Sequence, residues 1–490
     1  MDPLKSIFRN SSLLLAAQTG SSLIGMALVV LLPRFLGDVE FGRLHLVLSL
    51  TMMFGVAVEF GLTQVLARAI ACQRGLARPY LRTAVVAIAI LGAALYVALL
   101  GTVRLLGHHP STLELAMILG IVMVGEALCQ VLRAVFQAHE RMLVPVLARI
   151  AGNAFTLAVA VPLLLQGQGV QVVAIVMALA VVLQVAVNTV AVRRLEGFRR
   201  PASAAAAGSA LLAAGLPFLV GQALGNLYFR MDVVMLGWLT TEATVGWYGI
   251  ASRLLDALCF VPQVLTMATF PVAARLWVTA PDEFRATIRK TLHVLLVVTV
   301  PVVVTLLTLA REIVSLLFTL EAFGPAVPIL QVHAVTLGVL FVDFFLVGVL
   351  MAIGRERTWI AVAAAACVLS PLLSRLLIPL AESRYNNGGI GAALGTLLTE
   401  VFIMACALRL LPAGTLGVES RRVAVQVAGA GVAMALIVLL GRALDLPWML
   451  AAVGGGLAYL ALVIRLAILP SEATRWILAV VPWRAPARVV

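Results

Sequence analysis

Charged residues are scarce in this chain: they make up 12% of its 490 residues, whereas 62% are hydrophobic. Soluble domains carry roughly a quarter charged residues, so the composition excludes an ordinary water-soluble globular protein. No polar stretch is long enough to form a separate soluble domain, and the charges are concentrated in short joints between apolar stretches. The chain is therefore expected to lie almost wholly in a lipid bilayer.

Cysteine is also scarce, and recognisable catalytic motifs are missing. The cysteines are odd in number, dispersed and without CxxC spacing, so neither a disulfide framework nor a metal site is expected. They are Cys72, Cys129, Cys259, Cys367 and Cys406. The sequence contains no GxSxG, no HExxH and no phosphate-binding glycine loop. These absences argue against an enzyme and give no reason to expect a cofactor or a metal.

The formal net charge of +13 does not indicate nucleic-acid binding. Basic residues that contact phosphates cluster on a solvated face, whereas here they lie in the joints and follow the positive-inside rule. With the N-terminus placed inside, most basic residues fall on the inner joints. The outer joints hold only Arg34, Arg43, Arg104, Arg311, Arg375, Arg384 and Arg442. This asymmetry predicts an even number of spans with both termini in the cytoplasm.

Fourteen apolar stretches are each long enough to cross a bilayer, which takes about 20 residues of helix. The chain is predicted to be an all-α integral membrane protein with about 14 transmembrane helices. The expected helices cover residues 11–36, 43–66, 82–105, 112–136, 143–166, 170–192, 209–238, 245–274, 288–310, 326–353, 357–380, 389–411, 423–442 and 447–468.

The longest joint, about 193–208, divides the first twelve helices into two sets of six. The predicted organisation is an N-terminal six-helix lobe (1–200), a C-terminal six-helix lobe (201–415), and helices 13 and 14 with a cytoplasmic tail (416–490). The amphipathic end of that tail, residues 471–490, is expected either on the inner membrane surface or disordered.

The two sets of six helices resemble each other, which predicts an internal repeat. The first helix ends in "LLPRFLG", and "EFG" follows in the next joint. The seventh helix ends in the similar "DVVMLG", and "TVGWYG" follows it, at a spacing near 204 residues. Because each repeat has an even number of helices, both run the same way through the membrane. The glycines at these joints, among them Gly37, Gly42 and Gly246, are interpreted as turn residues.

Ionisable side chains at membrane depth are costly and usually face a cavity or a partner. Arg230 and Arg253 each lie about seven residues from the outer end of their helix, roughly 10 Å deep. Two guanidinium groups at matching depth on consecutive antiparallel helices could bind one anionic group, and phosphate suits their paired donors. The alternative is internal neutralisation, with Asp256 pairing with Arg253 on one helix face. Gln222 and Asn226 are the expected polar companions of substrate binding.

The remaining membrane-depth acids are candidates for ion coupling or for charge pairs. A carboxyl group in a low-dielectric cavity can carry a proton between two access states; the alternative is a carboxylate that bonds a neighbouring helix. The candidates are Glu59, Glu126, Asp232, Asp256, Asp343 and Glu400.

Three segments, Leu31 to Ala71, Asp232 to Leu276 and Asn386 to Glu400, resemble bacterial polysaccharide exporters. They are similar to O-antigen translocases of the Wzx type, whose superfamily (the multidrug/oligosaccharidyl-lipid/polysaccharide, or MOP, flippases) also holds multidrug extruders and lipid II flippases. The resemblance implies alternating access between two lobes. It also implies a cationic cavity that moves an undecaprenyl-diphosphate-linked oligosaccharide, the repeat unit of O-antigen, capsule or exopolysaccharide, across the bacterial inner membrane.

The function expected from the sequence is therefore that of an ion-coupled flippase, with H+ or Na+ as candidate ions. Partners would be the lipid-linked substrate, membrane lipids and glycan polymerases or glycosyltransferases of the same membrane. Two rival transporters stay open, a lipid II flippase and a cation-coupled multidrug extruder; an aromatic-lined cavity without convergent arginines would favour the extruder. A polytopic membrane glycosyltransferase or polymerase is the enzyme alternative, although such enzymes commonly need a larger outer loop than any here.

Overall fold

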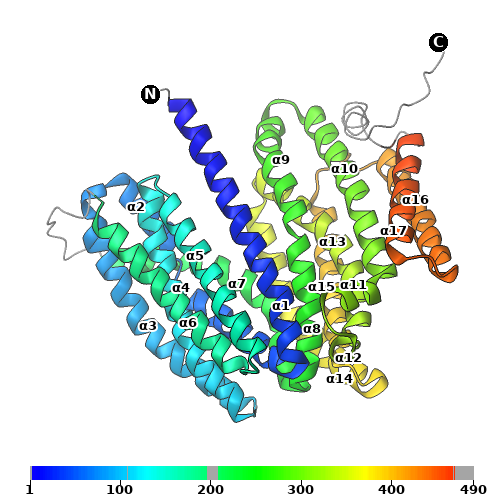
Figure 1. Ribbon diagram of the computed structural model, residues 1–490. Coiled ribbons are helices and arrows are strands. Elements are labelled where there is room, and N and C mark those ends of the chain that lie inside the picture. Colours follow the sequence, from blue (N-terminus) through cyan, green and yellow to red (C-terminus); the bar gives the residue numbers. More distant parts are fainter. Residues whose placement is uncertain (1–2, 108, 196–207, 467, 469–490) are drawn as a thin grey trace. The chain divides into compact units, whose positions relative to one another are not determined.

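The computed structural model describes residues 3–107, 109–195, 208–466 and 468, and these residues form helices and no β-strand (Figure 1). Thirteen of the described helical segments are long and apolar enough to cross a membrane. Arg199, Arg200 and the amphipathic segment 471–490 lie outside the described residues. The all-α membrane architecture predicted from the sequence is confirmed.

The helices follow one another with short connections, except for the longer joint between Arg193 and Gly208. In the first half of the chain they are α1 (Pro3–Glu59), α2 (Leu62–Cys72), the 3-10 turn η1 (Arg74–Leu76), α3 (Ala77–Leu105), α4 (Pro110–Ala138), α5 (Leu143–Leu165), α6 (Val170–Arg193), α7 (Gly208–Leu239) and α8 (Glu242–Leu258). In the second half they are α9 (Phe260–Thr279), α10 (Pro281–Thr308), α11 (Ala310–Leu317), α12 (Leu320–Phe323), α13 (Ala326–Ala352), α14 (Glu356–Tyr385), α15 (Gly388–Leu410), α16 (Val418–Ala443) and α17 (Trp448–Arg465).

Helix α1 contains two membrane spans. Its 57 residues would extend about 85 Å as one rod, nearly three times the roughly 30 Å hydrocarbon core. The rod is interrupted at Gly37, whose φ of 74° and ψ of −179° are not helical. Glycine tolerates this conformation because it lacks a Cβ atom. Dividing α1 at Gly37 turns the thirteen helical segments into the fourteen spans expected from the sequence.

Two of the expected helices are broken inside the membrane span. The second, predicted over 43–66, stops at Glu59 and restarts at Leu62, and the eighth, predicted over 245–274, changes from α8 to α9 at Cys259. Two short helices, α11 and α12, occupy a joint in which no helix was predicted. Their eight and four residues are too few for a membrane span, so a pattern of long apolar stretches does not reveal them.

Contacts divide the chain into two compact units. The first unit comprises Met1–Ile250, Leu317–Pro325 and Cys367–Gly395, and the second comprises Ala251–Leu316, Ala326–Ala366 and Thr396–Val490. The units are interleaved along the sequence. Contact units and repeat lobes are different divisions of a chain, so the lobes expected at 1–200 and 201–415, with 416–490 appended, stay a prediction.

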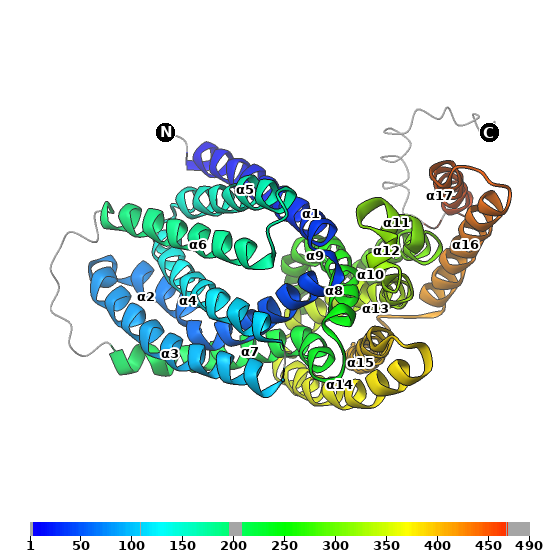
Figure 2. The ribbon, with the colours of Figure 1, turned by 60° about the horizontal axis from the view of Figure 1, so that its bottom comes forward.

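In the first unit, α6 lies between α5 and α4 (Figure 2). Helices in lipid gain little from the hydrophobic effect and instead associate through close van der Waals packing, which small residues permit. Gly125 of α4 receives the side chain of Val181, and Gly152 of α5 receives that of Gln184, both from α6. Two glycines therefore set how closely α6 approaches its neighbours.

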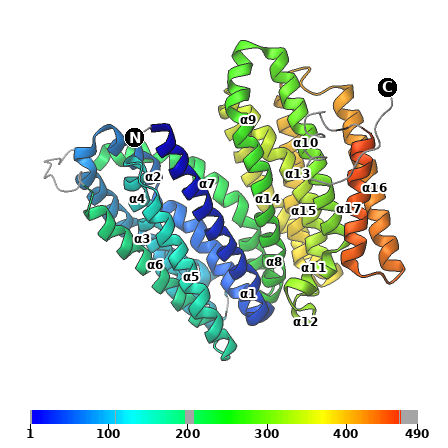
Figure 3. The same ribbon diagram turned by 45° about the horizontal axis from the view of Figure 1, so that its top comes forward.

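In the second unit, α10 contacts α9, α13 and α16, and α16 and α17 lie side by side (Figure 3). The predicted helices 13 and 14 correspond to α16 and α17. They pack on α10 through a cluster that includes Val297, Val427 and Met434. Tyr459 of α17 also donates a hydrogen bond from its hydroxyl to the Val297 carbonyl oxygen at 2.8 Å. This bond satisfies a buried polar group that water cannot reach.

Candidate functional site

The break between α1 and α2 is the first feature of the candidate site. Phe60 (φ 55°) and Gly61 (φ 67°) both adopt left-handed backbone conformations. At Gly61 a Cβ atom would lie 2.5 Å from the Gly215 carbonyl oxygen of α7. Glycine is therefore required at position 61 both for its backbone angle and for the close approach of α7.

Glu59 compensates for the backbone groups that this break leaves unpaired. The first amide groups of a helix have no partner within the helix, and the Glu59 Oε1 atom accepts a hydrogen bond from the Thr63 amide at 2.8 Å. Its Oε2 atom accepts one from Gln222 Nε2 of α7 at 3.3 Å. Glu59 is only 6% exposed. The carboxylate thus caps α2 and links the broken span to α7.

A polar cavity of about 440 Å³ opens beside this break, within the first unit. Helices α1, α2, α4, α5, α6 and α7 all contribute to its wall. Its lining residues are Leu48, Thr51, Met52, Gly55, Val56, Glu59, Thr63, Gln64, Val122, Met123, Glu126, Ala127, Gln130, Arg149, Met177, Gln222 and Asn226. The polar members are two carboxylates, one guanidinium group, four amides and two hydroxyls, and no lining residue is aromatic.

Four of the site residues predicted from the sequence line this one cavity: Glu59, Glu126, Gln222 and Asn226. Gln222 Nε2 lies 3.4 Å from the Gln64 Oε1 atom as well as contacting Glu59. Asn226 Nδ2 donates to the Gln222 carbonyl oxygen at 3.1 Å. These bonds orient the amide groups on the face of α7 that meets the cavity.

Gln130 and Arg149 are among the polar lining residues that were not predicted as site residues. Gln130 follows Glu126 by four residues, so both lie on one face of α4. Arg149 was expected in an inner joint, although it lies inside α5, six residues after the helix start at Leu143, or roughly 9 Å along the helix at about 1.5 Å per residue. The i, i+4 spacing and the position of Arg149 within a predicted span were the signals that could have identified them.

Arg230 continues the polar face of α7. Gln222, Asn226 and Arg230 follow one another at four-residue intervals and so share one side of the helix. Arg230 is half-buried and does not itself line the cavity. Arg253 belongs to the second unit. The predicted convergence of the two arginines on one phosphate, and the alternative pairing of Arg253 with Asp256, both stay predictions.

The other predicted acids lie apart from the cavity. Asp232 is buried and accepts hydrogen bonds from the Tyr248 hydroxyl of α8 and from the Val233 amide, the latter at 2.7 Å. Asp256 is exposed in the second unit. Asp343 of α13 and Glu400 of α15 are electrostatic neighbours in the second unit, 3% and 2% exposed. Whether any of them couples an ion stays a prediction.

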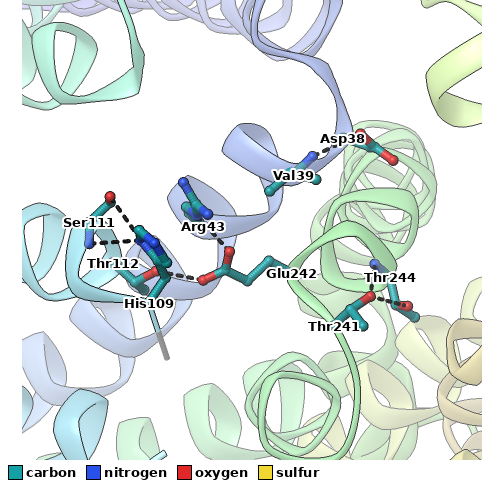
Figure 4. Close-up of polar contacts among 9 residues, drawn as sticks. All are labelled: Asp38, Val39, Arg43, His109, Ser111, Thr112, Thr241, Glu242 and Thr244. Atoms are coloured by element: carbon teal, nitrogen blue, oxygen red, sulfur yellow. Dashed lines mark hydrogen bonds and ion pairs between the residues drawn. The ribbon is translucent and has the colours of Figure 1, made fainter. Parts of the chain in front are cut away.

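A second polar assembly connects the two joints that the sequence predicts to be repeats of each other. We call it the clasp; it consists of Asp38, Gly42 and Arg43 of α1 with Glu242, Gly246 and Trp247 of α8. Arg43 Nε donates to Glu242 Oε2 at 2.5 Å, and Trp247 Nε1 donates to Asp38 Oδ2 at 3.0 Å. Glu242 Oε1 also accepts from the Thr112 hydroxyl of α4 at 2.6 Å (Figure 4). Each joint thus supplies one acceptor carboxylate and one donor to the other.

The backbones of the clasp meet with the same reciprocity. A Cβ atom at Gly42 would collide with the Glu242 carbonyl oxygen, and one at Gly246 would collide with that of Asp38. Asp38 and Glu242 are 204 residues apart, as are Gly42 and Gly246, which is the repeat spacing found in the sequence. The interpretation of Gly42 and Gly246 as turn residues is wrong: both lie inside helices, and they serve close helix approach. Only Gly37 of the three has a positive φ.

Among the described residues, no three His, Cys, Asp or Glu side chains are grouped so that they could hold a metal ion. All five cysteines carry free thiols.

Two family models match parts of this chain, and several solved structures share its fold. The family described as "Polysaccharide biosynthesis protein" matches residues 7–277, and the MatE family matches residues 217–376. The solved structure of the lipid II flippase MurJ in an inward closed conformation has a TM-score of 0.67 at 14% identity, over 92% of this chain and 97% of that chain. An inward-facing multidrug resistance MATE family transporter of the MOP superfamily has 0.66 at 15% identity, over 79% and 94%.

The eukaryotic MATE transporter AtDTX14 is similar to a lesser degree, with a TM-score of 0.57 at 17% identity, over 85% of this chain and 98% of that chain. No curated protein matches the sequence. At these identities the solved structures show that the fold is shared.

Proposed function

The chain belongs to the polysaccharide biosynthesis protein family, and we propose that it flips a lipid-linked oligosaccharide, carried on undecaprenyl diphosphate, across the bacterial inner membrane. The observation that carries the proposal is the lining of the polar cavity. Amides, carboxylates, hydroxyls and a guanidinium group are the donors and acceptors that sugar hydroxyls require. The volume of about 440 Å³ lies in the range of small-ligand sites.

The same lining argues against the main alternative function, that of a multidrug extruder. A cavity for apolar or cationic drugs would be expected to present aromatic side chains, and none of the lining residues is aromatic. A lipid II flippase is the closer alternative, because lipid II is itself a lipid-linked sugar. The short connections between the described helices support transport over glycosyl transfer or polymerisation, which would need room for catalysis at the membrane surface.

Alternating access supplies the mechanism that we propose. The clasp joins repeat-equivalent segments at the end of the helices expected to face outward, so its contacts would have to break when the site opens to that side. Arg230, on the cavity face of α7, would bind the diphosphate together with Arg253. The neighbouring carboxyl groups of Asp343 and Glu400 would hold H+ or Na+, because a proton or cation relieves the repulsion of two adjacent buried acids. In this proposal both termini face the cytoplasm, as the positive-inside rule implies.

The test uses the full chain in liposomes that contain a labelled undecaprenyl-diphosphate oligosaccharide. Gln222→Ala with Asn226→Ala is expected to reduce leaflet-resolved movement at least tenfold, because each lost hydrogen bond to substrate costs about 1 kcal/mol or more. The matched control is Gln166→Ala with Gln168→Ala, two exposed amides outside the cavity. Equal rates of lipid movement in both double variants would refute the assignment of the polar cavity as the substrate-binding site.

Three further arms separate the parts of the proposal. If the lipid still moves in the variant with Arg230→Ala and Arg253→Ala, the proposed binding of the diphosphate by these arginines is refuted, but the proposed flippase activity is not. Asp343→Asn is expected to abolish the response to an imposed H+ or Na+ gradient while substrate binding persists. Movement of lipid II or of a cationic dye in place of the oligosaccharide would refute the substrate.

A further inference from the structure

A second cavity of the first unit lies away from the polar one. It has a volume of about 560 Å³ and is bounded by the end of α4, the joint between α4 and α5, the start of α5 and the end of α6. The residues that matter for its chemistry are Phe136, Arg141, Val144, Val187, Val190 and Arg194. It shares no lining residue with the polar cavity. We call it the α4–α6 groove.

The groove has apolar walls and a basic rim. Val187 and Val190 are 42% and 51% exposed on the surface of the unit. Val187, Val190 and Arg194 recur at intervals of three and four residues, so they lie along one face of α6. The aliphatic face runs about 10 Å along the helix before it reaches the arginine. Arg141 approaches the same end of the groove from the α4–α5 joint.

Within the part of the chain that the structure describes, the two arginines have no side-chain partner. Arg141 and Arg194 are both exposed, and among the described residues neither side chain forms a hydrogen bond or an ion pair. Glu140 precedes Arg141 in the joint but does not line the groove. Two exposed cations at the rim of an aliphatic groove, at one end of three membrane helices, match a molecule with an anionic head and an apolar tail.

We propose that the α4–α6 groove binds one anionic glycerophospholipid. Its phosphate lies between Arg141 and Arg194, and one acyl chain lies along Val144, Val187 and Val190. The positive-inside rule alone explains why arginines occur at this end of the helices, but it does not require a cavity between them. The cavity distinguishes a binding site from a general surface charge, because its rim holds two exposed arginines that no described side chain neutralises. The proposal does not depend on the nature of the transported substrate.

Native mass spectrometry of the purified full chain tests the site, with phosphatidylglycerol and phosphatidylcholine of identical acyl chains as probes. The wild type is expected to retain phosphatidylglycerol preferentially. Arg141→Gln with Arg194→Gln should weaken that retention about 30-fold, since each basic group near a membrane surface contributes about fivefold. The matched control, Arg78→Gln with Arg82→Gln, removes two exposed arginines of α3 that do not line the groove, and it should retain the lipid.

A second variant leaves both arginines in place. Val187→Trp fills the groove and should abolish phosphatidylglycerol retention while the melting temperature and monomer mass are unchanged. Equal retention of the two lipids by the wild type, or equal losses in the two arginine variants, would overturn the proposal. So would complete competition by inorganic phosphate, which would indicate a site for the head alone. A dimer that disappears in Val187→Trp would instead assign the groove to a second copy of the chain.

Discussion

Replacing Glu242 is the most direct perturbation of the clasp. Its carboxylate accepts from Arg43 Nε at 2.5 Å and from the Thr112 hydroxyl at 2.6 Å, and the Arg43 and Glu242 side chains are only 18% and 13% exposed. Hydrogen bonds to charged groups contribute about 1.5–3 kcal/mol each. Breaking a fully buried pair costs about 3–5 kcal/mol, so the partial exposure here lowers the expected loss for Glu242→Ala to about 2–4 kcal/mol.

Equilibrium unfolding in mixed detergent micelles, followed by tryptophan fluorescence, measures this loss. Glu242→Gln keeps an acceptor oxygen and should cost less than Glu242→Ala. A double-mutant cycle with Arg43→Ala should give a coupling free energy of at least about 1 kcal/mol. The control is Glu114→Ala, which removes an exposed acid of α4 and should change the unfolding free energy by less than about 0.5 kcal/mol. A coupling energy of zero would refute the view that the reciprocal contacts hold the two joints together.

Substitutions at three other positions, Glu59, Gly61 and Gly246, give distinct expected results. Glu59→Gln retains an acceptor for the Thr63 amide and should unfold within about 1 kcal/mol of the wild type, whereas Glu59→Ala should lose about 1–2 kcal/mol in the same assay; equal losses would mean that the cap is unimportant. Gly61→Ala, at a positive φ and against backbone, should cost at least about 2 kcal/mol, and a fully stable variant would contradict the close approach of α7. Gly246→Ala should separate α1 from α8 and lower thermal stability, whereas Gly101→Ala, where nothing lies within 4 Å, should be neutral or stabilising.

The helices were predictable because lipid imposes a simple condition on the sequence. Every backbone group in the hydrocarbon must be paired, so a span is a helix of about 20 apolar residues. The ends of α5 and α6 accordingly fall within one residue of the predicted 143–166 and 170–192. The breaks at Phe60–Gly61 and at Cys259 leave hydropathy unchanged, and for that reason the sequence pattern did not reveal them.

The candidate site was predicted in part. Glu59, Glu126, Gln222 and Asn226 were predicted because they are polar residues within apolar spans. Such residues are costly in lipid unless they face a cavity or a partner. The same rule also selected Asp232, which instead bonds Tyr248. Hydropathy cannot separate a cavity-lining polar residue from one that holds two helices together, since both carry the same cost in lipid.

The sequence by itself determined that the chain spans the membrane about fourteen times and which polar residues fall within the spans, and it predicted that two joints 204 residues apart are related. Only the tertiary structure decided that those joints contact each other through Gly42 and Gly246, and that α7 carries its amides to the broken end of α1. The physical reason is that composition and periodicity depend on the solvent around each helix. Which helices become neighbours depends on packing between side chains distant in sequence.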